Sequence, residues 1–106
     1  MLSKKQRLSQ AEFTKFFKSG KRHRSPTATL IVSPHDSFHG AVVVSKKVSK
    51  KAVTRNTLRR RVYAQLYAAS KKKGKNVHII VLKPGFKDLT RVKQHETIQA
   101  LIAEVM

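Results

Sequence analysis

The sequence contains no cysteine and no tryptophan, and only 5 of its 106 residues are acidic. Without cysteine the chain can form neither disulfides nor thiolate metal sites. No apolar run approaches the roughly 18 residues of a membrane-spanning helix, so we predict no membrane partner. The basic N-terminal stretch MLSKKQRLSQ is followed by no apolar segment, which argues against a secretory signal and favours a cytoplasmic location.

The acidic residues are also unevenly placed, because residues 37–87 contain none. Against the 5 acids stand 24 lysines and arginines, which give a formal net charge of +19, while 40% of the residues are hydrophobic. That apolar share is too high for a disordered tail, so the composition indicates a folded domain. Its charge is expected to be neutralised by a polyanion, and nucleic acid is favoured over a membrane surface. No two carboxylates have the spacing of a hydrolytic metal site, so we predict no catalytic residues in this chain.

The local patterns predict a single domain, residues 1–106, with the element order α-β-β-β-α-β-α. Ser9 and Glu12 form a capping box for a helix that ends at Ser19, and Gly20 is expected to stop it in the left-handed conformation. The other predicted elements are a short edge strand over 21–24, a strand over 27–33, a hairpin loop over 34–40, a strand over 41–45, a helix over 52–70, a turn over 71–75, a strand over 76–83 and a C-terminal helix. Strands and helices mixed in this way predict an α/β (α+β) two-layer sandwich.

The middle of the chain, SKKVSKKAVTRNTLRRRV, is its most distinctive stretch. Eight of the sixteen residues from 46 to 61 are basic and none is acidic: Lys46, Lys47, Lys50, Lys51, Arg55, Arg59, Arg60 and Arg61. A charged helix face that is merely solvated usually mixes both signs, so this stretch favours phosphate binding.

On a helical wheel, Leu58, Val62, Leu66 and Ala69 cluster within about 80° and predict the buried side of the central helix. The adjoining arc carries Arg59, Asn56 and Arg60 with Tyr63 and Tyr67, and Arg55 lies at its edge. Arginine can grip phosphate oxygens, asparagine can bond a 2′-hydroxyl or a base edge, and tyrosine can stack on an unpaired base. The arc therefore predicts an RNA-binding surface.

The segment KKAVTRNTLRRRV resembles the Arg-Asn-x-x-(Lys/Arg)-Arg signature of the protein subunit of bacterial ribonuclease P. VVVSKKVSKKA is similar to the strand and Ser-Lys-Lys that precede that signature, LSQAEFTKFFKSG to the opening helix, and NVHIIVLKPG to the last strand. The similarity runs through nearly the whole chain in the same order.

The resemblance implies a four-stranded mixed sheet with a left-handed βαβ crossover, which no residue pattern could predict. It implies that the chain is the non-catalytic protein subunit of an endoribonuclease, whose RNA hydrolyses precursor tRNA with Mg²⁺ that the RNA mainly holds. The implied RNA-binding residues are Lys46, Lys47, Lys50, Lys51, Arg55, Asn56, Arg59, Arg60 and Tyr63. A cleft between the first helix and the sheet is expected to hold the single-stranded 5′ leader of precursor tRNA, with Phe13, Phe17, Thr29, Ile31 and Val43 at the matching positions.

The implied partners are therefore ribonuclease P RNA and precursor tRNA, with the protein a monomer within the ribonucleoprotein. Phe16 is assigned to the core. Two other functions remain open from the residues alone: a ribosomal or other structural RNA-binding protein, and a non-specific DNA-compacting protein. His35 and His39 flank Asp36 in a loop, but without a third ligand they are interpreted as surface residues and no metal site is predicted.

Overall fold

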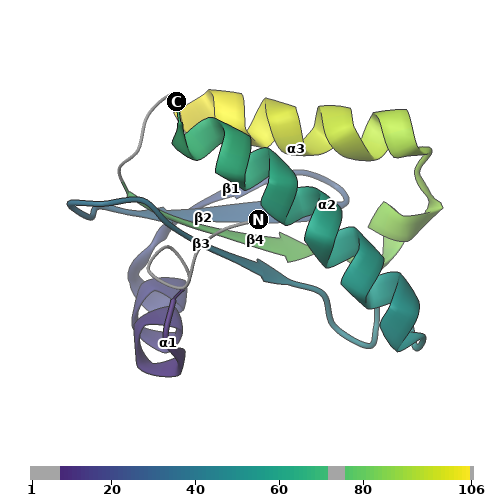
Figure 1. Ribbon diagram of the computed structural model, residues 1–106, viewed down its shortest axis with the longest axis horizontal. Helices are drawn as coiled ribbons and strands as arrows, with labels where there is room; N and C mark the ends of the chain where they lie inside the picture. Colours follow the sequence, from purple (N-terminus) through teal and green to yellow (C-terminus); the bar gives the residue numbers. More distant parts are fainter. Residues whose placement is uncertain (1–7, 72–75, 106) are drawn as a thin grey trace.

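The computed structural model describes residues 8–71 and 76–105 (Figure 1). Its elements in chain order are α1 (Gln10–Ser19), β1 (Lys21–Arg24), β2 (Ala28–Ser33), β3 (His39–Val43), α2 (Ala52–Ser70), β4 (Val77–Leu82), the 3₁₀ helix η2 (Pro84–Asp88) and α3 (Arg91–Val105). The predicted order is confirmed, with η2 as an addition that begins at the proline expected to end β4. Most of the predicted turn over 71–75 lies outside the described residues.

The four strands form one mixed sheet in the order β1-β2-β4-β3. Strand β2 is antiparallel to both β1 and β4, whereas β3 is parallel to β4. The predicted hairpin over 34–40 is wrong, because β4 lies between β2 and β3. Strand β4 (VHIIVL) is buried on both faces and pairs with β2 on one side and with β3 on the other. Local turn signals do not reveal such pairings between distant segments.

The crossover from β3 through α2 to β4 is left-handed, as the resemblance implies. In Figure 1 both strands run from left to right, β3 lies nearer to the viewer, and α2 returns above the sheet. The chain therefore turns counterclockwise as it moves away from the viewer. This hand is rare among parallel connections.

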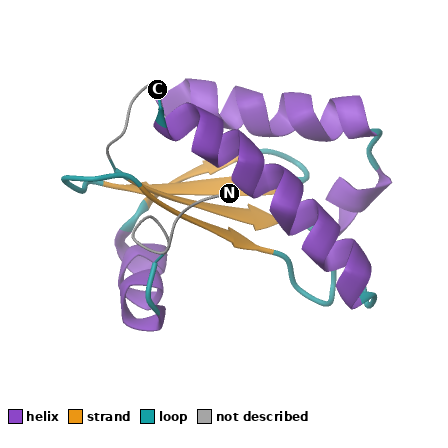
Figure 2. Ribbon diagram, viewed as in Figure 1, coloured by secondary structure: helices purple, strands orange, loops and turns teal. Residues whose placement is uncertain are grey.

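Helices α2 and α3 cover one face of the sheet, and α1 lies against the opposite face (Figure 2). The main core forms under α2 and α3 and includes Leu58, Val62 and Leu66, three of the residues predicted from the wheel. A smaller core of Ile31, Ala41, Val77 and Ile79 lies on the α1 face. Within the described residues, no helix is long and apolar enough to cross a lipid bilayer.

Helix α1 begins as predicted, with reciprocal hydrogen bonds between Ser9 and Glu12. It ends differently, because Gly20 is extended at φ −72° and ψ 154° rather than left-handed. The reason for glycine here is space: a Cβ would lie 2.4 Å from Ile31 Cγ2 and 2.9 Å from the Phe16 carbonyl oxygen. Gly20 therefore lets the end of α1 approach the sheet closely.

Candidate nucleic-acid interface

The four lysines of the basic segment project from the turn that leads into α2. Val48 is fully buried and anchors this turn, while Lys46, Lys47, Lys50 and Lys51 are exposed around it. No side chain caps the beginning of α2 at Lys51. The free amide groups of the first helical turn therefore add their partial positive charge to that of the lysines.

Arg55 has a structural role as well as a charge. Its Nη1 donates hydrogen bonds to the carbonyl oxygens of Ser49 (2.9 Å) and Lys50 (3.0 Å). These bonds tie the turn that carries the four lysines, which we call the lysine turn, to the first turn of α2. Since a guanidinium has five N–H donors, others remain for phosphate.

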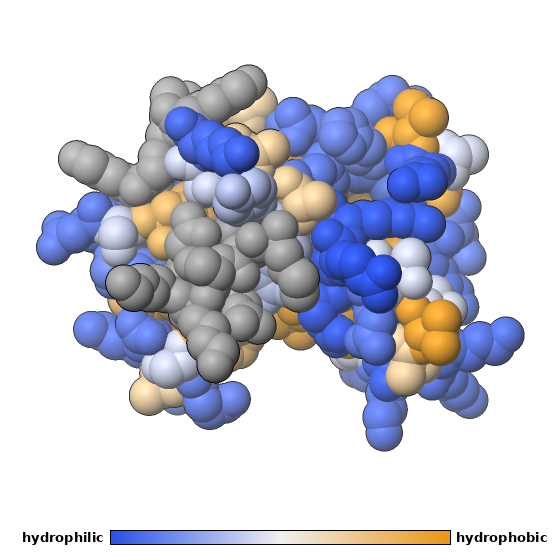
Figure 3. All heavy atoms as spheres, viewed as in Figure 1, coloured by the Kyte–Doolittle hydropathy of each residue, from blue (hydrophilic) through white to orange (hydrophobic). Residues whose placement is uncertain are grey.

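Arg59, Asn56 and Arg60 lie together on the outer side of α2, as the wheel predicts. Arg59 Nη1 donates to Asn56 Oδ1 at 2.7 Å, which orients both groups, and Arg60 is exposed. The ion pairs among the described residues are His23–Glu104 and Lys93–Glu96, so no acid there neutralises this surface. Hydrophilic atoms gather over the middle of α2 in Figure 3.

Tyr63 differs from its prediction as an RNA-stacking residue. Its hydroxyl oxygen accepts a hydrogen bond from the Val42 backbone N at 3.3 Å, and its ring packs partly buried against the main core. Because β3 is an edge strand, its outward N–H groups need partners, and Tyr63 supplies one. Tyr63 therefore holds α2 to β3, and its ring does not have two free faces for a base.

The predicted cleft residues lie on the α1 face, where one row of side chains crosses all four strands. The register pairs Arg24 with Thr29, Thr29 with Val81, and Val81 with Val43. We call these four residues the floor row. At the interstrand spacing of a sheet, the row is about 14 Å wide.

The floor row reaches from β1 to the edge strand β3, after which the chain enters the lysine turn. In Figure 1, α1 lies under the left part of the sheet, while the right-hand ends of the strands, beside the start of α2, have no described helix beneath them. Although α2 and α1 lie on opposite faces, the cationic helix and the floor row therefore meet around β3. The turn that carries the four lysines therefore lies next to the β3 end of the floor row.

Three cationic residues at the β1 end of the floor row were not predicted as site residues. Arg22, Arg24 and Lys83 line a cavity of about 290 Å³ together with Phe17, Thr29 and Val81. The Arg22 guanidinium carbon lies 5.0 Å from the centre of the Phe17 ring, and its Nη2 donates to the Phe17 carbonyl oxygen at 3.0 Å. Alternation along KRHR could have indicated that Arg22 and Arg24 share one face, but not which face.

The aromatic residues of α1 are all partly buried. Phe13 and Phe17 stack at 5.5 Å between ring centres, and both pack on the smaller core, as does Phe16. Phe16, which was predicted in the core, is partly buried and packs against the smaller core. Ile31 is the clearest correction among the predicted cleft residues: it is only 1% exposed and lies beneath α1, so it seats the helix instead of lining an open surface.

A second cavity of about 380 Å³ lies between α2 and α3, away from the floor row. Leu58, Val62 and Phe86 form apolar parts of its lining, and Arg61 and Arg91 are among its polar residues. Arg61 Nη1 donates to Gln94 Oε1 at 3.5 Å. Arg61 therefore points away from Arg59 and Arg60, as the wheel predicts.

These features define a class of protein: a small, strongly basic α+β domain with a cationic helix beside a partly exposed face of the sheet. The sequence model of the Ribonuclease P family matches residues 2–106, so the chain belongs to that family. A relative from Synechocystis sp., named ribonuclease P protein component, is 37% identical over 81 residues, which cover 70% of this chain and 64% of the relative. The chain thus matches slightly less than two thirds of that protein's length.

Solved structures of the RNase P protein from Staphylococcus aureus have the same fold. One at 2.0 Å matches with a TM-score of 0.86 and 19% identity, covering 94% of each chain. A mutant described as defective in mRNA degradation activity matches with a TM-score of 0.83 and 20% identity, covering 96% of this chain and 89% of the other. At these identities the structural matches establish the fold, and the predicted four-stranded mixed sheet is confirmed.

Proposed function

We propose that this chain is the protein component of ribonuclease P, which binds the catalytic RNA and the 5′ leader of precursor tRNA. In this proposal the protein assists endonucleolytic maturation of the tRNA 5′ end and acts as a monomer within a cytoplasmic ribonucleoprotein. Family membership and the named relative support the assignment.

The observation that carries the proposal is the continuity between the cationic helix and the floor row. In this arrangement Arg59, Arg60 and the lysine turn bind RNA phosphates. An unpaired strand can then continue around β3 onto the α1 face. There the floor row and Phe17 offer apolar and aromatic surface, while Arg24 and Lys83 supply charge at the far end. Cationic grooves with stacking side chains are typical of single-strand binding.

The chain's own carboxylates do not suit Mg²⁺. Asp36, Asp88, Glu96 and Glu104 are all exposed, and no three acids converge among residues 8–71 and 76–105. Mg²⁺ prefers oxygen ligands and keeps several waters, so RNA phosphate oxygens are the natural ligands in the complex. We therefore propose that the RNA supplies the metal-assisted hydrolysis, while this protein screens phosphate repulsion and positions the leader.

Reconstitution tests this proposal. Addition of the protein to a bacterial ribonuclease P RNA at low Mg²⁺ should accelerate cleavage of precursor tRNA, and the protein alone should cleave neither precursor tRNA nor an unstructured RNA. A structural RNA-binding protein would bind RNA without accelerating this cleavage. That result would refute the proposed function, and cleavage by the protein alone would refute its non-catalytic role.

A further inference from the structure

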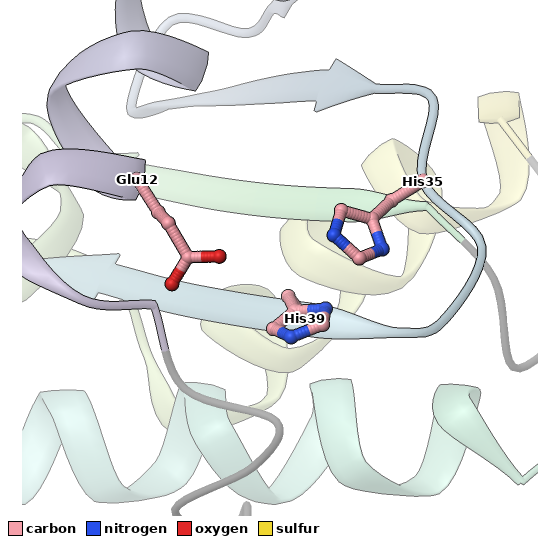
Figure 4. Close-up of side chains that lie close together, drawn as sticks. All are labelled: Glu12, His35 and His39. Atoms are coloured by element: carbon pink, nitrogen blue, oxygen red, sulfur yellow. The ribbon is translucent and has the colours of Figure 1, made fainter.

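We propose that Glu12, His35 and His39 form a binding site for a divalent transition-metal ion of the Zn²⁺ type. The sequence offers only two histidines in one loop, but the fold brings a third ligand to them from α1. One potential ligand atom from each residue lies within 4.8 Å of the others (Figure 4). The site is separate from the cationic helix and does not depend on the proposed function.

The backbone around the two histidines is held from the beginning of β4. The Asn76 N donates to the His35 carbonyl oxygen at 3.3 Å, and the His39 N donates to the Asn76 carbonyl oxygen at 3.1 Å. Asn76 itself has a positive φ of 74°. His35, in the connection between β2 and β3, and His39, at the start of β3, are thereby fixed with their ring centres 4.4 Å apart.

The Glu12 carboxylate is also held in place by a hydrogen bond. Glu12 Oε1 accepts a hydrogen bond from the Ser9 N at 3.1 Å, which fixes the side chain at the first turn of α1. Hydrogen bonding to Ser9 lowers the pKa of Glu12, and the neighbouring histidines act in the same direction. The carboxylate is therefore charged, as a metal ligand must be. Phe16 packs against His35 with ring centres 6.0 Å apart and keeps this ring near α1.

Ligand chemistry points to zinc rather than magnesium. Imidazole nitrogens suit Zn²⁺, Cu²⁺ and Ni²⁺, and two histidines with one glutamate are a known zinc donor set that leaves a fourth position for water. Tetrahedral Zn²⁺ holds such ligands about 3.4 Å apart, as follows from bonds of roughly 2.1 Å. The ligand atoms therefore need to approach one another by up to about 1.4 Å, which rotation of these partly buried side chains can supply.

The two histidines differ in whether their hydrogen bonds leave a ring nitrogen available for the ion. His39 Nδ1 lies 3.3 Å from the Ser37 carbonyl oxygen, an arrangement that places the ring proton on Nδ1 and leaves Nε2 free for the ion. His35 Nδ1 accepts a hydrogen bond from the Ser37 N at 3.1 Å. In the neutral ring this bond leaves the proton on Nε2, so ligation by His35 must disturb the Ser37 bond. The Ser37 amide is therefore a specific reporter of binding.

A bound ion would connect the first turn of α1 to the segment between β2 and β3. These parts of the chain are otherwise joined through the smaller core and the Phe16–His35 contact. An ion that binds only the folded arrangement stabilises it by mass action. The site would therefore clamp α1 onto the sheet.

Calorimetric titration of metal-free, tag-free full-length protein with ZnCl₂ tests the proposal. We expect one Zn²⁺ per chain, a shift of the Ser37 amide resonance, and a rise in the thermal midpoint of about 10 °C at a free Zn²⁺ concentration of one hundred times Kd. Glu12→Gln keeps a capping-box residue but removes the charge, and it should weaken binding at least tenfold. His39→Ala should do the same, and the exposed His95→Ala serves as a matched histidine control.

The proposal is overturned if no stoichiometric binding occurs, or if Glu12→Gln and His39→Ala bind Zn²⁺ as tightly as the unmodified protein. Equal weakening by His95→Ala would overturn it as well, because the ion would then lie elsewhere. Circular dichroism of each metal-free variant shows whether the fold is retained, and Glu12→Gln still provides the test if His39→Ala does not fold. No RNA is present, so the result is independent of the reconstitution experiment.

Discussion

Replacement of Arg59 and Arg60 by alanine should reduce the salt dependence of RNA binding. Arg60 is exposed and Arg59 is partly exposed on α2, and no acid pairs with them among the described residues. If each contacts one phosphate, the variant releases two fewer counterions on binding. The slope of log K against log salt concentration should then fall in magnitude by roughly 1.4 to 1.8.

The size of this change makes it measurable. Between 50 and 200 mM salt, the unmodified protein should lose roughly 7 to 12 times more affinity than the variant, because a fourfold change in salt is raised to the power of the slope difference. Filter binding or fluorescence anisotropy with ribonuclease P RNA at four or five salt concentrations gives both slopes directly.

The control removes the same amount of charge from the cavity between α2 and α3. Arg61 and Arg91 line the cavity between α2 and α3, so their joint replacement by alanine lowers the net charge by two without touching the proposed surface. Its slope should stay close to that of the unmodified protein. An unchanged slope for the Arg59 and Arg60 variant, or an equal decrease in the control, would refute the argument that location rather than total charge decides the binding.

Three further predictions concern the floor row and the core. Phe17→Ala should lower the affinity for leader-bearing precursor tRNA by roughly fivefold or more relative to leaderless tRNA in competition binding, since stacking on one base is worth about 1–3 kcal/mol, and an equal loss for both RNAs would assign Phe17 to packing alone. Gly20→Ala should destabilise the fold by about 1–3 kcal/mol in urea unfolding, because the new methyl group meets Ile31, and unchanged stability would contradict the close approach. Burial lowers the pKa of His78 to about 4, so below pH 6.5 the unfolded chain binds a proton that the folded chain does not. The free energy of unfolding should therefore fall by about 3 kcal/mol from pH 6.5 to 4, with no further loss from this group below pH 4. His78→Phe should flatten this limb of the pH profile, and an unchanged limb would show that other groups cause it.

Sequence reasoning predicted the elements well because their signals are local. The Ser9–Glu12 capping box, the apolar stripe of α2 and the proline after β4 each act within a few residues, and the structure has them where expected. The order of the strands was harder to predict. The turn residues between β2 and β3 are the same whether these strands pair directly or lie on either side of another strand. Only the insertion of β4 decided between them.

The sequence by itself determined that the chain is basic, that the charge is concentrated between residues 46 and 61, and that one side of the central helix is cationic. These properties follow from composition and helical periodicity, which need no partner. The tertiary structure alone decided that Ile31 lies beneath α1, that Tyr63 caps the edge of β3, and that Arg24 joins the floor row. It also brought Glu12 to His35 and His39. Each of these depends on strand order and on which face a helix covers, and both are set by burial across the whole chain rather than by neighbouring residues.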